Sequence, residues 1–135
     1  MLRTALLSLV LLAPVAAAAQ VPALCSDAPN QMEAGACVSA KLDKANADLN
    51  RVYAALKGRL DANGQRNLLA AQRAWLTFRD RECDLRTGAD PGDPTAGGTI
   101  GPMLVGECLT GLTVDRTRDL QAQLKCPGGD LSCPQ

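Results

Sequence analysis

The sequence predicts an all-α protein: a small, disulfide-bonded three-helix domain, with helices at about residues 30–60, 65–86 and 100–125. Apolar residues recur at spacings of three and four in three long stretches, which places them on one face of a helix. No stretch shows the sustained apolar–polar alternation that is typical of a strand. Segments rich in Gly, Asp and Pro separate the three stretches, so we expect short turns and one longer loop between the helices.

The N-terminal residues have the pattern of a signal peptide. A short basic region at 1–3 precedes an apolar run at 5–13, and four alanines at 16–19 supply the small residues that signal peptidase recognises. The apolar run is too short to span a bilayer. We therefore expect cleavage near Ala19 and a soluble periplasmic or secreted protein. The predicted organisation is a signal peptide at 1–19, a helical domain at 20–126 and a C-terminal tail at 127–135.

The cysteines are expected to be structural. They are Cys25, Cys37, Cys83, Cys108, Cys126 and Cys133. Leu24 precedes Cys25, where a lipid-modified cysteine would need a small residue. An even number of cysteines in an exported chain indicates disulfides, although six cysteines allow 15 pairings and the residues alone do not choose among them. No C-x-x-C pair and no histidine occurs, so neither a metal site nor a redox-active pair is predicted, and no cofactor is expected.

The first helix is predicted from its start signal and its apolar stripe. Asn30, followed three residues later by Glu33, resembles a capping box. The stripe consists of Val38, Leu42, Ala45, Leu49, Val52 and Leu56. Because Asn and Gly tolerate the left-handed backbone of a tight turn, we expect the segment 61–64 to break the helix.

The second helix is expected to bury its aromatic residues. Its predicted core stripe contains Leu68, Ala71, Trp75 and Phe78, flanked by Leu69, Leu76 and Cys83. Gly88 is placed to end the helix. The loop at 88–98 contains two aspartates but lacks the alternating ligands of an EF-hand, so a loop of solvated turns is expected there rather than a calcium site.

The third helix is expected to begin near Thr99, with Pro102 in its first turn. The side predicted to be buried carries Val105, Leu109, Leu112, Leu120 and Leu124. Arg116 falls on the same side. Since an unpaired buried arginine is strongly unfavourable, we expect helix-end carbonyls or a carboxylate, such as that of Asp80 or Glu82, to meet its guanidinium.

The composition argues against several classes of function. The chain has 14 basic and 14 acidic residues, and it loses Arg3 with the leader, so the mature protein has a net charge of −1 and no excess charge for nucleic acid. The absence of histidine removes the usual general base of hydrolases. Asp80, Glu82 and Asp84 cluster near a helix end, but two carboxylates facing across a cleft are what glycoside hydrolysis requires. We therefore do not expect an enzyme.

Three segments resemble the lysozyme inhibitor LprI-like N-terminal domain family. The segment 45–53, A-N-A-D-L-N-x-x-Y, is similar to its A-D-x-E-L-N-x-x-Y motif, and the segment 71–83 fits A-Q-R-A-W-x-x-[FY]-R-D-x-x-C. Farther on, the segment 97–100, Cys108 and the run T-x-x-R-x-x-x-L from Thr113 follow the family pattern. The motif residues, structural or facing a partner, are Leu49, Asn50, Tyr53, Gln72, Arg73, Trp75, Phe78, Arg79, Asp80 and Arg116.

The resemblance also implies a disulfide pairing. The implied pairs are Cys25–Cys37, Cys83–Cys108 and Cys126–Cys133. Asn46 stands where the family usually has Asp. If that Asp normally meets Arg116, the ion pair becomes here a hydrogen bond between a neutral and a charged group.

The function that the resemblance implies is binding to a lysozyme in the cell envelope, and hence a protein partner. The most available surface is the loop at 88–98 together with Asp84 and Arg86 at the preceding helix end, which are the candidate partner contacts. The alternative is a periplasmic structural or interaction module that has no lysozyme target.

Overall fold

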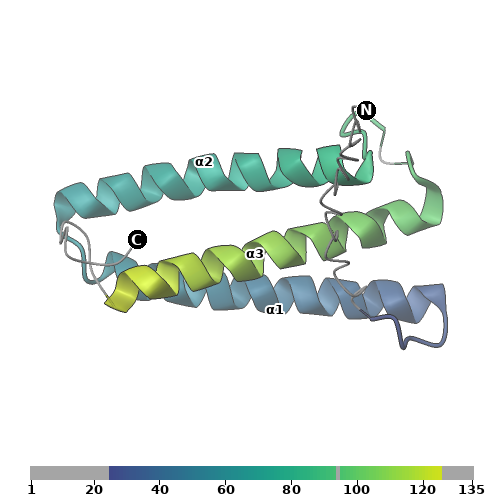
Figure 1. Ribbon diagram of the computed structural model, residues 1–135, viewed down its shortest axis with the longest axis horizontal. Coiled ribbons are helices and arrows are strands. Elements are labelled where there is room, and N and C mark those ends of the chain that lie inside the picture. The colour runs from purple at the N-terminus through teal and green to yellow at the C-terminus, as the bar shows by residue number, and fades with distance from the viewer. Residues whose placement is uncertain (1–24, 94, 126–135) are drawn as a thin grey trace, which may run out of the picture.

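The computed structural model describes residues 25–93 and 95–125, which form three long helices and one short one. These are α1 (Gln31–Lys57), α2 (Ala62–Thr87), the 3-10 helix η1 (Gly98–Ile100) and α3 (Gly101–Lys125). Figure 1 shows α3 beside α1 along most of its length and α2 on the other side of α3; α1 and α3 run in one direction and α2 in the opposite one. The predicted all-α, three-helix class is confirmed, whereas the predicted signal peptide and C-terminal tail lie outside the described residues.

α1 and α2 begin and end at residue types that favour a helix boundary. The Asn30 side chain accepts a hydrogen bond from the backbone N–H of Glu33 at 3.0 Å, as the capping box predicts. The first break comes earlier than the predicted 61–64, because Asp61 caps α2 by accepting from the N–H of Gly64 at 2.7 Å. Gly88 ends α2 in the left-handed conformation (φ 71°), as predicted.

The core lies mainly in the seam between α1 and α3. Five residues of the predicted stripe on α1 are buried: Val38, Ala45, Leu49, Val52 and Leu56. The facing residues of α3 are not the leucines that the periodicity singled out. They are Gly106, Thr110, Thr113, Thr117 and Leu120, of which only Leu120 was expected to be buried. Val105, Leu109 and Leu112 are half-buried at the edges of the seam.

Small residues occupy this face of α3 because the two helices approach each other closely. A Cβ atom placed on Gly106 would lie 2.7 Å from Cγ1 of Val38. The hydroxyls of Thr110 and Thr117 donate to the carbonyls of Gly106 and Thr113, at 2.8 and 2.9 Å, within their own helix. With the hydroxyls satisfied in this way, the threonine methyl groups are free to pack against α1.

Two disulfides fasten the end of the bundle where α1 and α3 begin and α2 ends. Cys25 is bonded to Cys37, and Cys83 is bonded to Cys108. These are two of the three predicted pairs; Cys126 and Cys133 lie outside the described residues. None of the helices in the described ranges combines the length and the apolar character needed to cross a membrane.

Candidate functional site

The face that α2 turns toward the other helices mixes apolar and polar residues. Of this helix only Leu68 and Cys83 are buried. Between them Gln72, half-buried Trp75 and Arg79 point inward, and Trp75 packs against the core.

The prediction of a buried stripe through Ala71 and Phe78 is therefore wrong. Phe78 is 54% exposed, Ala71 is exposed, and so are the flanking Leu69 and Leu76. The inward positions fall one residue later, at Gln72 and Arg79, because polar partners for these two side chains lie on α1 and α3.

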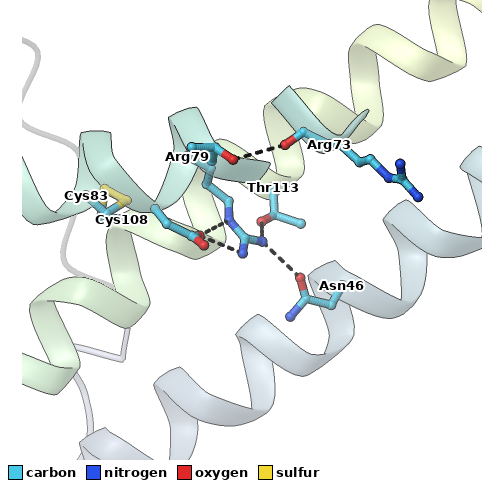
Figure 2. A network of polar contacts seen from close by, with 8 residues as sticks. Asn46, Arg73, Arg79, Cys83, Cys108 and Thr113 are labelled. Atoms are coloured by element: carbon cyan, nitrogen blue, oxygen red, sulfur yellow. Dashed lines mark hydrogen bonds and ion pairs between the residues drawn. A yellow bond between two sulfur atoms is a disulfide. The ribbon is translucent and has the colours of Figure 1, made fainter. Parts of the chain in front are cut away.

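Arg79 joins all three helices (Figure 2). Its Nη1 donates to Oγ1 of Thr113 on α3 at 3.3 Å and reaches Oδ1 of Asn46 on α1 at 3.5 Å. Its Nη2 forms an ion pair with the Asp80 carboxylate at 2.8 Å. The Arg79 side chain is only 14% exposed, yet its charge is compensated and its donors are used. Asn46 thus contacts Arg79, which corrects the expectation that this position meets Arg116.

Arg116 has a different environment on the same tryptophan. The guanidinium of Arg79 lies 5.3 Å from the centroid of the Trp75 ring, and that of Arg116 lies 5.8 Å from it. The Nε of Arg116 donates to Oε1 of Gln72 at 3.2 Å. Burial lowers the pKa of Arg116, and the negative charge of Asp119 opposes that shift.

The expected carboxylate partner of Arg116 is not found. Within residues 25–93 and 95–125 no carboxylate oxygen lies within ion-pair distance of its guanidinium. Asp80 is paired with Arg79, and Glu82 is paired with Arg86. The neutral amide of Gln72 and the indole of Trp75 take the place of a counter-ion, which leaves the charge of Arg116 only partly compensated.

A cleft of about 780 Å³ lies beside Arg116, between the start of α2 and the ends of α1 and α3. Its walls include the leucines Leu56, Leu60, Leu68 and Leu120. Two basic residues, Arg59 and Arg116, also line it, and the Nη1 of Arg59 donates to the carbonyl of Leu124 at 2.8 Å. Arg59 was not singled out from the sequence, because it follows the end of a helix in a segment with no motif.

The surface proposed from the sequence lies at the opposite end of α2. There Arg86 is paired with Glu82 at 2.7 Å, and Asp84 is paired with Arg81 at 3.5 Å. In the loop that follows, the Asp90 and Asp93 side chains accept hydrogen bonds from residues two positions later.

A hydrogen bond from the Thr95 hydroxyl is the main reason that the pKa of Asp93 lies below its usual range. These aspartates stabilise turns, as the loop prediction implies. Across the described residues, no three His, Cys, Asp or Glu side chains gather closely enough to hold a metal ion.

The remaining motif residues divide between core and surface. Leu49 is buried and Tyr53 is half-buried against the core, whereas Asn50 is exposed. Arg73 is also exposed, and in Figure 2 its guanidinium points away from Arg79 and Thr113.

Comparison with known proteins gives two matches. The family model described as "Lysozyme inhibitor LprI" matches residues 25–120, which include both disulfides and the two arginines on Trp75. The chain is also 36% identical over 134 residues to the Rhizobium meliloti (strain 1021) protein described as "Uncharacterized protein R02472", and the match covers 85% of this chain and 89% of that protein. No solved structure matches the chain.

Proposed function

This chain belongs to the lysozyme inhibitor LprI family, and on that basis we propose that it is an exported protein that binds a lysozyme and inhibits it. The observation that carries the proposal is the extent of the family match. It runs from Cys25 to residue 120 and so takes in α1, α2 and most of α3 rather than one short motif. An inhibitor acts by occupying a surface of its target, so the proposal assigns this chain no catalytic residues and no cofactor.

Export is part of the same proposal. The leader at 1–19 would be removed near Ala19, and the mature protein would consist of the domain at 20–126 and the tail at 127–135. The Cys25–Cys37 and Cys83–Cys108 disulfides support this assignment, because disulfides form and persist in oxidising compartments such as the periplasm.

Two surfaces are available for a protein partner. One is the end of α2 with Asp84 and Arg86, together with the loop at 88–98. The other is the cleft beside Arg116, at the opposite end of the bundle. Exposed Arg73 lies between them on α2, and arginine is favoured at protein interfaces because its rigid guanidinium offers several donors.

The test of the proposed function is an inhibition assay with the mature, disulfide-bonded protein. A panel of lysozymes is given labelled peptidoglycan, and the release of label is measured with increasing amounts of the protein. We expect dose-dependent suppression that saturates near equimolar enzyme and inhibitor for at least one lysozyme. A lack of suppression across the whole panel would contradict inhibition, and release of label by the protein alone would contradict its assignment as a non-enzyme.

A second candidate function is an interaction module of the cell envelope with another protein target. The observation in its favour is the net charge of the mature chain, 13 basic and 14 acidic residues, which provides little long-range attraction to a strongly basic lysozyme. Recovery of a different envelope protein on the immobilised chain, together with inactivity against every lysozyme, is the result that this function predicts.

A further inference from the structure

The charges of the bundle are separated between its two halves. The half with the disulfides, residues 25–44, 75–93 and 95–113, carries nine acidic and five basic side chains, a net charge of −4. The half with the cleft, residues 45–74 and 114–125, carries four acidic and eight basic side chains, a net charge of +4. The cleft beside Arg116 therefore lies in a positive region, although the charges of the two halves cancel over the described residues.

The two arginines of the positive half that have a close acidic partner both lie outside the cleft. Arg51 pairs with Asp48 and Arg118 pairs with Asp115, both at 2.8 Å. Asp61 lines the cleft, but its carboxylate caps α2. Arg116 is the half-buried arginine of this half. Among the described residues its only hydrogen-bond acceptor is Gln72, to which it donates through Nε. Both Nη atoms are thus left without an acceptor in the described part of the chain.

We propose that this cleft is a docking site for an acidic side chain of a protein partner, and that Arg116 binds its carboxylate. The partner's identity as a lysozyme rests on the proposed function, whereas the chemistry of the site does not. A carboxylate would supply the counter-ion that Arg116 lacks, through two parallel charge-assisted hydrogen bonds. The leucine walls and the volume of about 780 Å³ suit the methylene groups and neighbouring residues of a protruding segment better than a small hydrated anion.

The first experiment uses Trp75 as the probe, because it is the chain's single tryptophan and Arg116 lies over its ring. A hexaglutamate peptide is titrated into the full mature protein, with hexaglutamine at the same ionic strength as the control. We expect a saturable change in Trp75 emission with hexaglutamate only. In Arg116→Gln the affinity should fall about 10- to 100-fold, the loss of one charge-assisted contact.

Arg118→Gln is the matched control. It removes the same charge from the same helix, two residues away, at a side chain that is 70% exposed and paired with Asp115. We expect a change of about twofold at most. Equal losses in the two variants would overturn the site, because they would show that only net charge matters. Arg116→Lys should keep part of the affinity, since it keeps the charge without the fork of donors.

The second experiment repeats the lysozyme assay with the same variants. If a lysozyme is inhibited, Arg116→Gln should weaken inhibition about 10- to 100-fold while Arg118→Gln does not. Unchanged inhibition by Arg116→Gln would overturn the docking site and leave the proposed function standing. Binding of hexaglutamate without inhibition of any lysozyme would support the site and contradict the proposed function.

Other occupants of the cleft give distinct results. Inorganic phosphate that changes Trp75 emission as strongly as hexaglutamate would overturn the preference for an acidic side chain. Tighter hexaglutamate binding in Asp130→Asn would show that the acidic residue of the chain's own tail competes for Arg116, and so would overturn an external partner as the first occupant. Emission that depends on protein concentration, together with dimers in sedimentation, would assign the cleft to a second copy.

Discussion

The two ends of α2 are held in different ways. At its C-terminal end the Cys83–Cys108 disulfide joins it to α3, and Arg79, one turn earlier, has partners on both other helices. At its N-terminal end Leu68 is the one residue of the first three turns that is buried, and the cleft opens beside it. A helix anchored covalently at one end can be packed sparsely at the other, and binding surfaces are commonly found in such less tightly packed regions.

The two arginines on Trp75 show the same contrast at the level of side chains. The N–H donors of Arg79 bond within the fold, to Asp80, Thr113 and Asn46. Arg116 lines the cleft beside the N-terminal end of α2, and its charge is only partly compensated. Arg79 is thus a structural residue of the bundle, whereas the donors of Arg116 are available to a ligand.

The largest predicted effect concerns the end of the bundle that carries the two disulfides. Replacing Cys83 and Cys108 with alanine removes a link across 25 residues and should lower the free energy of unfolding by about 3–4 kcal/mol. The same replacement at Cys25 and Cys37 should cost less, because that disulfide spans 12 residues and ties the N-terminal arm to α1 rather than one helix to another. Urea unfolding measures both. An equal or larger loss for the Cys25–Cys37 pair would contradict the predicted order of the two disulfides.

The next effect concerns the seam between α1 and α3, where packing is closest. Gly106→Ala should lower the free energy of unfolding by about 1–3 kcal/mol, because the new methyl would overlap Val38, and a valine in a helix has little freedom to rotate away. Gly111→Ala is the matched control on the same helix. Its new methyl meets nothing within 4 Å, and alanine favours the helix, so stability should rise by up to about 1 kcal/mol. A neutral Gly106→Ala would contradict the close approach.

The sequence predicted α1 well and the other two helices less completely, for a physical reason. On α1 the residues that face the seam are mostly large and apolar, so the spacing from Val38 to Leu56 identifies the buried face directly. On α3 the closest approach requires Gly106 and threonines, and on α2 the inward positions are Gln72 and Arg79. A rule that places apolar residues inside selects the neighbouring leucines on α3 and Phe78 on α2.

The candidate site depends on distances that no local pattern contains. The motif drew attention to Gln72, Trp75, Arg79 and Arg116, but it did not show which arginine is paired. That outcome depends on Asp80 lying next to Arg79 and on Thr113 and Asn46 lying across from it. Arg59 joins the cleft only because the end of α1 lies next to the end of α3.

A smaller effect on the free energy of unfolding should distinguish Arg79 from Arg116. Arg79→Gln should lower the free energy of unfolding by about 1–3 kcal/mol, since it leaves Thr113 and Asn46 without their charged partner. Arg116→Gln should change it by less than about 1 kcal/mol. Burial lowers the pKa of Arg116, so folding favours its neutral form, and at neutral pH, below that pKa, the protonated group opposes folding. Urea unfolding at pH 7 tests the order, and a greater loss for Arg116→Gln would reverse the two assignments.

The smallest effect tests whether the first turn of α2 shapes the cleft. Asp61→Ala removes the acceptor for the Gly64 N–H and should lower the free energy of unfolding by about 1 kcal/mol. Asn30→Ala removes the corresponding acceptor on α1 at a similar cost. The two variants should differ in ligand binding, because Asp61, Asn63 and Gly64 line the cleft whereas Asn30 caps the start of α1 at the other end of the bundle.

In the Trp75 titration, Asp61→Ala should therefore alter the affinity for hexaglutamate while Asn30→Ala leaves it unchanged. Two opposing changes act in Asp61→Ala: the loss of a negative charge from the cleft strengthens binding, and fraying of the first turn weakens it. Asp61→Asn separates them, because asparagine caps a helix about as well as aspartate but carries no charge. Tighter binding in Asp61→Asn than in Asp61→Ala would show that a well-formed first turn shapes the cleft; equal affinity in the two variants would contradict it.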